Sequence, residues 1–517
     1  MTATAGMAPM VELDLGTIIG FSTESVDGVK IETYKGIPFA KFDKRFDPSY
    51  LYNEPLGRFE AFQSGPPSYQ KMAGNIPLEN EYDCLTLDVW TPNSKPEKPL
   101  PVYVFIHGGA NVFDSSASNY YQFANTADDG IVCVSINYRV GVHGFSTFRL
   151  DDGTLIANQA MSDLIAGLEW VQKYVSAFGG DPKQVTIGGQ SAGGYNVSYL
   201  INSPKAAGLF NRAIMQSGGD LGLSIDEAMK ISMDYASYLS GREVSSSQEA
   251  YEILSAKGGY ELVERYSYVD GVPDCFYIYN CYPVNDGVYL PVDPLKNLQS
   301  EKANRVDVMV GQNANEAAMY THFYYKIRME YFDFLVKSYC REEHIPALRE
   351  FYGLNDESAY EEIRLAIRNF GEISFLYDSY LVADAMSAAG KDVYMYQFGY
   401  GKERVNEDYY FYVDMSRPCC ATHSSELGLV YRNGTWEQDE KSLALTMDMH
   451  KAWVNFIKYG NPNGEKGGEL RLDWPKYEAK TKPILYFDEE SKVCSLADTR
   501  VISSLQKVFD LMYGYEF

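Results

Sequence analysis

An apolar, β-type run at 185–188 leads into Gly189-Gln190-Ser191-Ala192-Gly193 and then into a helix-like segment. A serine on such a sharp strand-to-helix turn has strained backbone geometry, so the residues two before and two after it must be small. Gly189 and Gly193 meet that need. The helix that Ser191 opens would direct free N–H groups toward a developing negative charge. The pattern therefore predicts that Ser191 is an activated nucleophile.

Composition limits the partners that this chain can bind. The net charge of −25 argues against nucleic acid and anionic membranes, because phosphate contacts need clustered lysine and arginine. No apolar run reaches the roughly 18 residues that span a bilayer, and residues 1–7 lack the basic and apolar regions of a secretion signal. We therefore expect no nucleic-acid partner, no membrane insertion and no secretion.

The cysteines and histidines do not indicate a metal site. Eight cysteines occur without paired Cys-x-x-Cys spacing, and the chain has only six histidines. We expect neither a metal ion nor an organic cofactor.

Secondary-structure patterns indicate an α/β chain. Residues 101–106 and 131–138 are typical of buried strands, and residues 157–178 form a long helical pattern before the strand that precedes Ser191. This alternation predicts a mostly parallel sheet flanked by helices. Residues from about 222 to 420 are richer in helical patterns, with strands only near 306–311 and 393–398. No linker composition separates the two halves, so we predict one domain, 1–517, with lid-like helical insertions.

Acyl transfer by a serine needs a general base, a carboxylate that orients the base, and donors for the oxyanion. In the chain order expected for this sheet topology, the acid follows the serine and the histidine comes last. That order leaves four candidate bases, His322, His344, His423 and His450.

Several further motifs occur in order along nearly the whole chain, and together they resemble the type-B carboxylesterase family, the cholinesterase-like branch of the α/β-hydrolases. The matching stretches are residues 34–40, 83–92, 137–145, 158–163, 178–182 and 455–462. The resemblance implies the α/β-hydrolase fold. Carried over position by position, it implies Ser191 as nucleophile, Glu316 as acid and His423 as base.

Small residues follow the strand that ends in Phe105-Ile106-His107. Backbone N–H groups in such a stretch can approach a substrate carbonyl without obstruction by Cβ atoms. We therefore expect Gly109, Ala110 and Ala192 to form an oxyanion hole, and His107 to be a structural part of this loop.

The sequence departs from the family pattern at informative positions. Family members often carry glutamate before the nucleophile, whereas this chain has Gln190, which we expect at the substrate pocket with a weaker attraction for cationic alcohols. Residues 69–83 lack the tryptophan that cholinesterases present to choline, which disfavours a cholinesterase. The resemblance also places Tyr277 and Tyr279 near the acyl pocket.

The cysteine equivalent to Cys84 forms a disulfide with an upstream cysteine in secreted eukaryotic members, but residues 1–83 contain no cysteine. A free Cys84 fits a reducing cytoplasm, from which we infer a bacterial, cytoplasmic protein.

These expectations converge on a serine carboxylesterase. Its substrates would be small-molecule esters of small to medium hydrophobic or aryl alcohols, hydrolysed through an acyl-enzyme. Two alternatives remain open. One is an amidase or carbamate hydrolase that uses the same site, and the other is a non-catalytic, cholinesterase-like binding module. The sequence predicts no particular oligomeric state.

Overall fold

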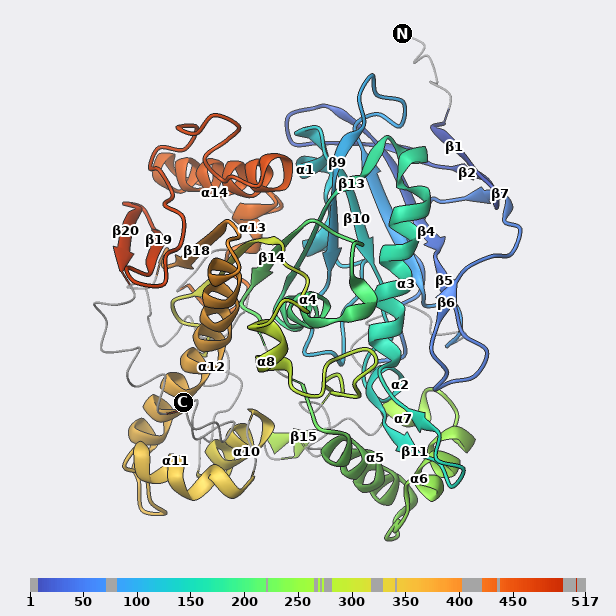
Figure 1. Cartoon of the computed structure of the whole chain (residues 1–517), viewed down its shortest axis with the longest axis vertical. Helices are drawn as coiled ribbons and strands as arrows, with labels where there is room; N and C mark the ends of the chain where they lie inside the picture. Colours follow the sequence, from blue (N-terminus) through green and yellow to red (C-terminus); the bar gives the residue numbers. More distant parts are fainter. Residues whose placement is uncertain are drawn as a thin grey trace.

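A computed structural model of the chain describes residues 8–70, 81–219, 222–264, 268–269, 272–273, 281–317, 329–339, 342–401, 421–434, 438–495 and 508. Its centre is an 11-stranded sheet with the order β20-β19-β18-β17-β14-β13-β9-β10-β8-β4-β3 (Figure 1). The strands are β3 Phe21–Glu24, β4 Lys30–Pro38, β8 Thr86–Thr91, β9 Leu100–Ile106, β10 Val132–Ile136, β13 Gly180–Gln190, β14 Arg212–Gln216, β17 Asp307–Asn313, β18 Val393–Phe398, β19 Pro483–Phe487 and β20 Lys492–Ser495.

The middle of this sheet is parallel and its edges are antiparallel. All neighbours from β10 to β19 pair in parallel, whereas β8, β4 and β3 at one edge and β20 at the other pair antiparallel. The mostly parallel sheet expected from the sequence is confirmed.

The expectation that strands and helices alternate through the first half is wrong for its beginning. Within the described residues up to β9 there are strands and no helix, and several lie outside the central sheet. They are β1 Met10–Leu13, β2 Gly16–Ile19 and β7 Gly57–Glu60 in one small sheet, and β5 Ala40–Lys41 with β6 Tyr50–Leu51 in another. Antiparallel strands need only short connections, so no crossover helix is required there.

Helices cover both faces of the sheet. On β9, Val102, Val104 and Ile106 belong to one hydrophobic cluster, which includes residues of α3, α4 and α12. Tyr103 and Phe105 belong to the other, which includes residues of α1 and α14. Because side chains alternate along a strand, the two clusters are the two layers that sandwich the sheet.

The helices are α1 Ala124–Asp128, α2 Val142–Phe145, α3 Gln159–Tyr174, α4 Ala192–Asn202, α5 Ile225–Ser240, α6 Ser247–Ala256, α7 Glu261–Glu264, α8 Pro294–Leu298, α10 Met329–Tyr339, α11 Ile345–Phe351, α12 Tyr360–Ala388, α13 Leu427–Val430 and α14 Glu440–Tyr459. Short 3₁₀ turns are η1 Asn119–Tyr121, η2 Val175–Phe178, η3 Pro204–Ala206 and η5 Glu342–His344. Two further hairpins are β11 Phe148–Arg149 with β12 Leu155–Ile156, and β15 Tyr268–Val269 with β16 Val272–Pro273.

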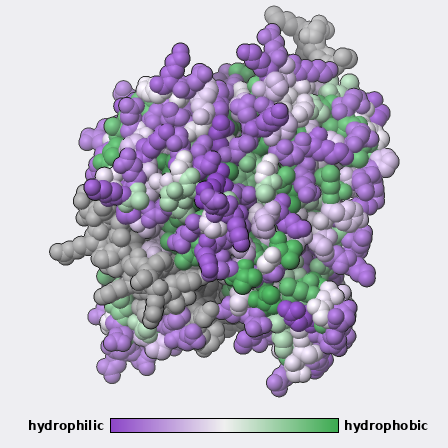
Figure 2. Space-filling view, viewed as in Figure 1, coloured by the Kyte–Doolittle hydropathy of each residue, from purple (hydrophilic) through white to green (hydrophobic). Residues whose placement is uncertain are grey.

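The segment richest in helices lies between β14 and β18, and α5, α6, α10 and α11 gather below the sheet in Figure 1. Local signals fix some of their ends. Ser224 and Glu227 form a capping box at the start of α5, and Gly241 ends that helix with a φ of 70°. Hydrophilic residues cover most of the face in Figure 2, with hydrophobic ones gathered in its lower half.

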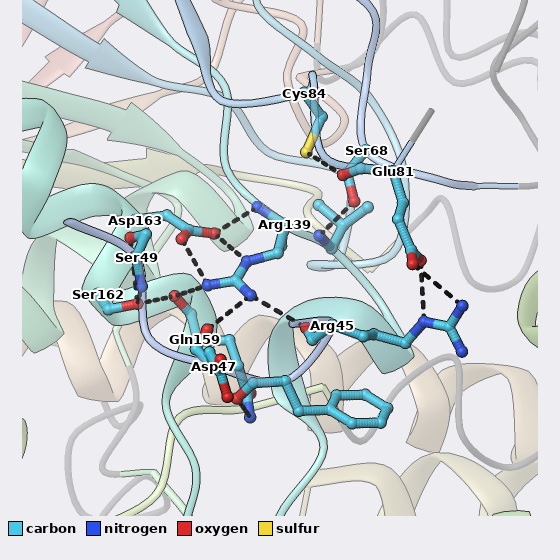
Figure 3. A network of polar contacts seen from close by, with 12 residues as sticks. Arg45, Asp47, Ser49, Ser68, Glu81, Cys84, Arg139, Gln159, Ser162 and Asp163 are labelled. Atoms are coloured by element: carbon cyan, nitrogen blue, oxygen red, sulfur yellow. Dashed lines mark hydrogen bonds and ion pairs between the residues drawn. The ribbon is translucent and has the colours of Figure 1, made fainter. Parts of the chain in front are cut away.

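A buried ion pair joins the loop after β10 to α3 (Figure 3). Arg139 Nη2 lies 2.8 Å from Asp163 Oδ1, and these side chains are 1% and 0% exposed. The same guanidinium donates to the carbonyl oxygens of Arg45 and Asp47. The pair therefore fixes the segment around residue 46 against the sheet, and it leaves few of its own polar atoms unbonded.

Candidate active site

Ser191 lies at the turn between β13 and α4, as the sequence predicts. Its φ of 58° and ψ of −129° are unusual for a residue with a Cβ atom, and such strain concentrates at functional sites. Ser191 is partly exposed, whereas the residues on either side of it, Gln190 and Ala192, are each 1% exposed. Ser191 is thus the accessible residue of an otherwise buried turn.

The two glycines of the motif are required by close backbone packing. A Cβ atom on Gly189 would lie 2.4 Å from the carbonyl carbon of Gly193, and one on Gly193 would lie 2.1 Å from the carbonyl oxygen of Ile106. The prediction that the residues flanking Ser191 must be small to avoid each other is confirmed. The same contact holds the start of α4 against the end of β9.

A buried carboxylate faces one ring nitrogen of His423. Nδ1 of His423 lies 2.5 Å from Oε2 of Glu316, and the side chains are 8% and 0% exposed. The other carboxylate oxygen, Oε1, accepts two hydrogen bonds, both at 2.6 Å. One comes from the Ser217 hydroxyl and the other from the main-chain N–H of Asn313. Glu316 is therefore held at fixed distances, and its orientation sets that of the imidazole.

The loops that carry these two residues are joined directly. The Asn315 N–H donates to the carbonyl oxygen of Ala421 at 3.0 Å, and Asn315 and Thr422 form an isolated parallel bridge. Residues more than one hundred positions apart thus meet beyond the end of β17.

The other candidate histidines have different surroundings. His450 lies on α14, where its ring nitrogens contact the Val430 carbonyl and Asp129. His344 ends the 3₁₀ turn at 342–344, and His322 is outside the described residues. Among the described candidates for the base, only His423 contacts a buried glutamate. That glutamate, Glu316, lies between Ser191 and His423 in the chain, as the expected order requires.

Gln190, which the sequence predicts at the substrate pocket, lies against the imidazole of His423. Its side-chain Nε2 lies 3.2 Å from Nε2 of His423. With Nδ1–H donated to Glu316, Nε2 is the acceptor nitrogen, so the Gln190 amide donates to it. The residue is thus buried beside the imidazole.

The loop after β9 lies beside Ser191. A Cβ atom on Gly108 would be 3.2 Å from Cβ of Ser191. The next residues, Gly109 and Ala110, are partly exposed, and in the described part of the chain neither their N–H groups nor that of Ala192 donate to a protein acceptor. These three amides are available to a ligand oxygen.

His107 has the structural role that the sequence indicates. Its ring stacks on Tyr138 with centroids 4.4 Å apart, and its Nδ1 lies 2.9 Å from the Gly108 carbonyl oxygen. Burial lowers the pKa of His107, so the ring is neutral here.

A second buried carboxyl group, Glu426, is linked to Glu316 through Asn313, which donates hydrogen bonds to both. It accepts hydrogen bonds from Gln216 at 3.0 Å and from the Asn313 side chain at 2.7 Å. Burial, followed by the nearby charge of Glu316, raises the pKa of Glu426 to about 7. Sequence reasoning missed Ser217, Asn313 and Glu426. The position of the first two at the carboxyl ends of parallel strands is a signal that could have identified them.

Aromatic rings extend from the imidazole. Phe375 of α12 lies 5.1 Å from His423 between ring centroids, Tyr195 of α4 lies 6.2 Å from Phe375, and Tyr282 lies 6.4 Å from Tyr195. No sequence motif marks these three rings. Tyr277 and Tyr279, which the resemblance places near the acyl pocket, are outside the described residues.

Two other kinds of feature are absent from the described ranges. No group of three or more histidine, cysteine or acidic side chains there could hold a metal ion. No described helix is long and apolar enough to cross a membrane.

Comparisons with known proteins agree with this geometry. The model of the carboxylesterase family matches residues 7–505. Carboxylesterase 1C of Rattus norvegicus is 31% identical over 514 residues, covering 91% of this chain and 88% of the rat protein.

Solved structures give the same result. Carboxylesterase EST55 of Geobacillus stearothermophilus superimposes with a TM-score of 0.74 at 28% identity, covering 96% of this chain and 100% of that one. A thermophilic PNB esterase has a TM-score of 0.78 at 23% identity, with coverages of 96% and 100%, and supports the fold alone. The sheet flanked by helices is thus the α/β-hydrolase fold, and this chain belongs to the carboxylesterase family.

Proposed function

We propose that this protein is a serine carboxylesterase in which Ser191, His423 and Glu316 form the catalytic triad. The observation that carries the proposal is the 2.5 Å contact between His423 and the buried Glu316. Ser191, held at positive φ, directly follows Gln190, whose side chain contacts the same imidazole. A carboxylate in this position keeps the proton on Nδ1, which leaves Nε2 free to accept a proton.

The reaction follows from these roles. Nε2 of His423 takes the proton of the Ser191 hydroxyl as Oγ bonds to the ester carbonyl carbon. The carbonyl electron pair moves to the oxygen, which the amides of Gly109, Ala110 and Ala192 stabilise. Collapse of this intermediate breaks the bond to the alcohol oxygen, and His423 returns the proton to that oxygen. Water then repeats the sequence on the acyl-enzyme and releases the acid.

For substrates, we propose esters of small to medium hydrophobic or aryl alcohols. The rings of Phe375, Tyr195 and Tyr282 support this class, because aromatic surfaces near His423 favour apolar and aryl groups. The neutral Gln190 beside the imidazole gives a cationic alcohol no carboxylate to pair with.

The proposal also includes location and domain organisation. The free, buried thiol of Cys84 supports a reducing compartment, hence a cytoplasmic and bacterial protein. One hydrophobic cluster with residues from β4 to β18 supports a single domain, with the helices of about 222–420 as insertions over the site. Fractionation of the source cells tests the first point, and the number of calorimetric unfolding transitions tests the second.

The function is tested by a fluorophosphonate probe together with p-nitrophenyl acetate and butyrate turnover. Wild type should gain one covalent adduct in its intact mass and hydrolyse both esters. Ser191→Ala should lose the adduct and at least about 10⁴-fold of the turnover. Ser135→Ala in β10 is the matched control and should behave as wild type. A folded wild type with neither adduct nor turnover contradicts the proposal.

Leaving-group preference is tested with a matched pair of substrates. p-Nitrophenyl acetate and p-nitroacetanilide share the acyl group and differ in the ester or amide bond. Turnover of the ester far above that of the amide is expected, and the reverse order would favour an amidase.

A further inference from the structure

One buried residue beside the proposed oxyanion hole has no place in the triad. Asn111 follows Ala110 in the loop after β9 and is 1% exposed. Both residues have positive φ, 53° for Ala110 and 59° for Asn111. Asparagine tolerates this left-handed conformation better than most residues, whereas alanine adopts it only under strain.

The Asn111 side chain bonds to three separate segments. Its Oδ1 accepts from Asn196 Nδ2 at 3.0 Å and from the Tyr138 hydroxyl at 3.2 Å. Its Nδ2 donates to the carbonyl oxygen of Cys281 at 2.8 Å. The main-chain oxygen of Asn111 accepts from the Gly141 N–H at 2.6 Å.

These bonds explain how the strained loop persists. Unusual backbone conformations survive where surrounding contacts over-determine them. Here the contacts converge on Asn111, and the strained Ala110 is its direct neighbour. Fixing Asn111 therefore fixes the peptide that joins it to Ala110, and the N–H groups of Ala110 and Gly109 follow within the next two peptides of the same loop.

One of the bonds crosses between the two parts of the proposed hole. Asn196 lies on α4, four residues after Ala192, so both belong to about one helical turn. Asn111 adjoins Ala110 on the other side. The Asn111–Asn196 bond therefore links the loop that carries two of the amides to the helix that carries the third.

We propose that Asn111 is a positioning residue that aligns Gly109 and Ala110 with Ala192 for the oxyanion. This inference rests on the proposed function, because it needs a reaction that develops charge on a carbonyl oxygen. The amides contribute only if they lie within hydrogen-bond distance of the oxyanion, so a small displacement of the loop lowers the rate while leaving substrate binding nearly unchanged.

Two substitutions separate the backbone from the side chain. Asn111→Gly keeps the left-handed conformation without strain and removes all side-chain bonds, whereas Asn111→Ala also adds strain. We expect kcat for p-nitrophenyl acetate to fall about 10- to 100-fold in the glycine variant, with KM within about threefold of wild type. The alanine variant should fall further.

A trifluoromethyl ketone provides a readout that general destabilisation does not change. Its hemiketal with Ser191 places an oxyanion in the hole, so its inhibition constant should rise in proportion to the loss of kcat/KM. Asn196→Ala should lower kcat in the same direction, and the double variant should lose less than the sum of the two single effects.

Asn125→Ala is the matched control. Asn125 is also buried, and its side chain donates to the Arg432 carbonyl and accepts from the Val26 N–H. This variant should lose stability while retaining kcat.

Different outcomes contradict different claims. Wild type without adduct or turnover overturns the proposed function itself. An active wild type in which folded Asn111→Gly keeps kcat and the inhibition constant within about threefold overturns the positioning role. If the Asn111 variants do not fold, unchanged kcat in Asn196→Ala overturns it instead.

Discussion

The side-chain amide nitrogen of Gln190 lies 3.2 Å from Nε2 of His423, on the opposite side of the ring from Glu316. The imidazole is therefore contacted by a carboxylate on one side and by a neutral amide on the other. In the proposed mechanism Nε2 is also the nitrogen that accepts the Ser191 proton, so Gln190 and the serine would share one acceptor.

This relationship predicts that Gln190→Glu changes selectivity for charge. A carboxylate here should raise kcat/KM for a choline ester relative to the neutral 3,3-dimethylbutyl ester of the same acid by about 3- to 10-fold, because a cation gains a partner at contact distance. Gln190→Leu removes polarity without adding charge and should not raise this ratio. An unchanged ratio in the glutamate variant would show that the alcohol group does not approach Gln190.

The buried carboxyl group of Glu426 predicts a pH dependence of stability. Its folded pKa of about 7 lies above the ordinary 4.5, so between these values the folded state binds a proton that the unfolded state has released. The contribution of Glu426 to the free energy of unfolding therefore falls as the pH rises from 4.5 to about 7 and is lowest above pH 7. The stability of Glu426→Gln relative to wild type should increase as the pH rises from 5 to 7 and then level off.

Urea unfolding midpoints at pH 5, 6, 7 and 8 measure this dependence. The slope is the readout, because glutamine also changes the bonds with Gln216 and Asn313 at every pH. Glu357→Gln, at an exposed position, should give a difference from wild type that does not vary with pH. A flat difference for Glu426→Gln would contradict the raised pKa.

Close packing at the turn predicts that Gly189→Ala is destabilising and inactivating. The new methyl group would overlap the main chain of Gly193, which cannot move without displacing α4 from β9. We expect a loss of roughly 1–3 kcal/mol in the free energy of unfolding, together with loss of the fluorophosphonate adduct. Gly258→Ala, where the nearest atoms belong to the flexible Glu261 side chain, should retain both stability and labelling.

The buried pair Arg139–Asp163 in Figure 3 predicts that one substitution lowers the free energy of unfolding more than a double substitution does. Arg139→Met leaves the buried carboxylate of Asp163 without its partner and should cost roughly 3–5 kcal/mol in the free energy of unfolding. Adding Asp163→Leu removes the unpaired charge and should recover part of that loss. Arg432→Met breaks an ion pair with the exposed Asp27 and should cost about 0–1 kcal/mol. Equal losses for the two single variants would contradict this account.

Local patterns in the sequence predicted the elements closest to Ser191. The strand before it, the glycines around it and the helices at 157–178 all follow from short-range steric and periodic rules, and the structure has them. The first strands were missed because β1, β2 and β3 are only four residues long, and because β8 is buried at every position and so shows no alternation.

Residues that meet across loops were beyond such rules. Four histidines remained as candidate bases until the resemblance selected His423, because the pairing of residues 316 and 423 depends on how two distant loops meet. Asn111 and Glu426 belong to no local pattern, and Ser217 is marked only by its position after the end of a parallel strand. Their importance arises from hydrogen bonds to segments far away in the chain.

The parallel strands β13, β14 and β17 end at nearly the same position in the sheet, which limits how insertions can alter the candidate active site. Gln190 pairs with Gln216, and Gln216 with Gly311, so the loops that begin with Ser191 and Ser217 start at the same height, and the one that carries Glu316 starts close by. Their separation is set by the spacing of neighbouring strands, about 4.8 Å. Segments inserted after these strands can therefore grow or shrink without altering the spacing between the starts of these loops. Helix α12 is the exception, because its Phe375 packs against His423. The other insertions can thus diversify while the strand ends keep the loops that carry Ser191, Ser217 and Glu316 in place.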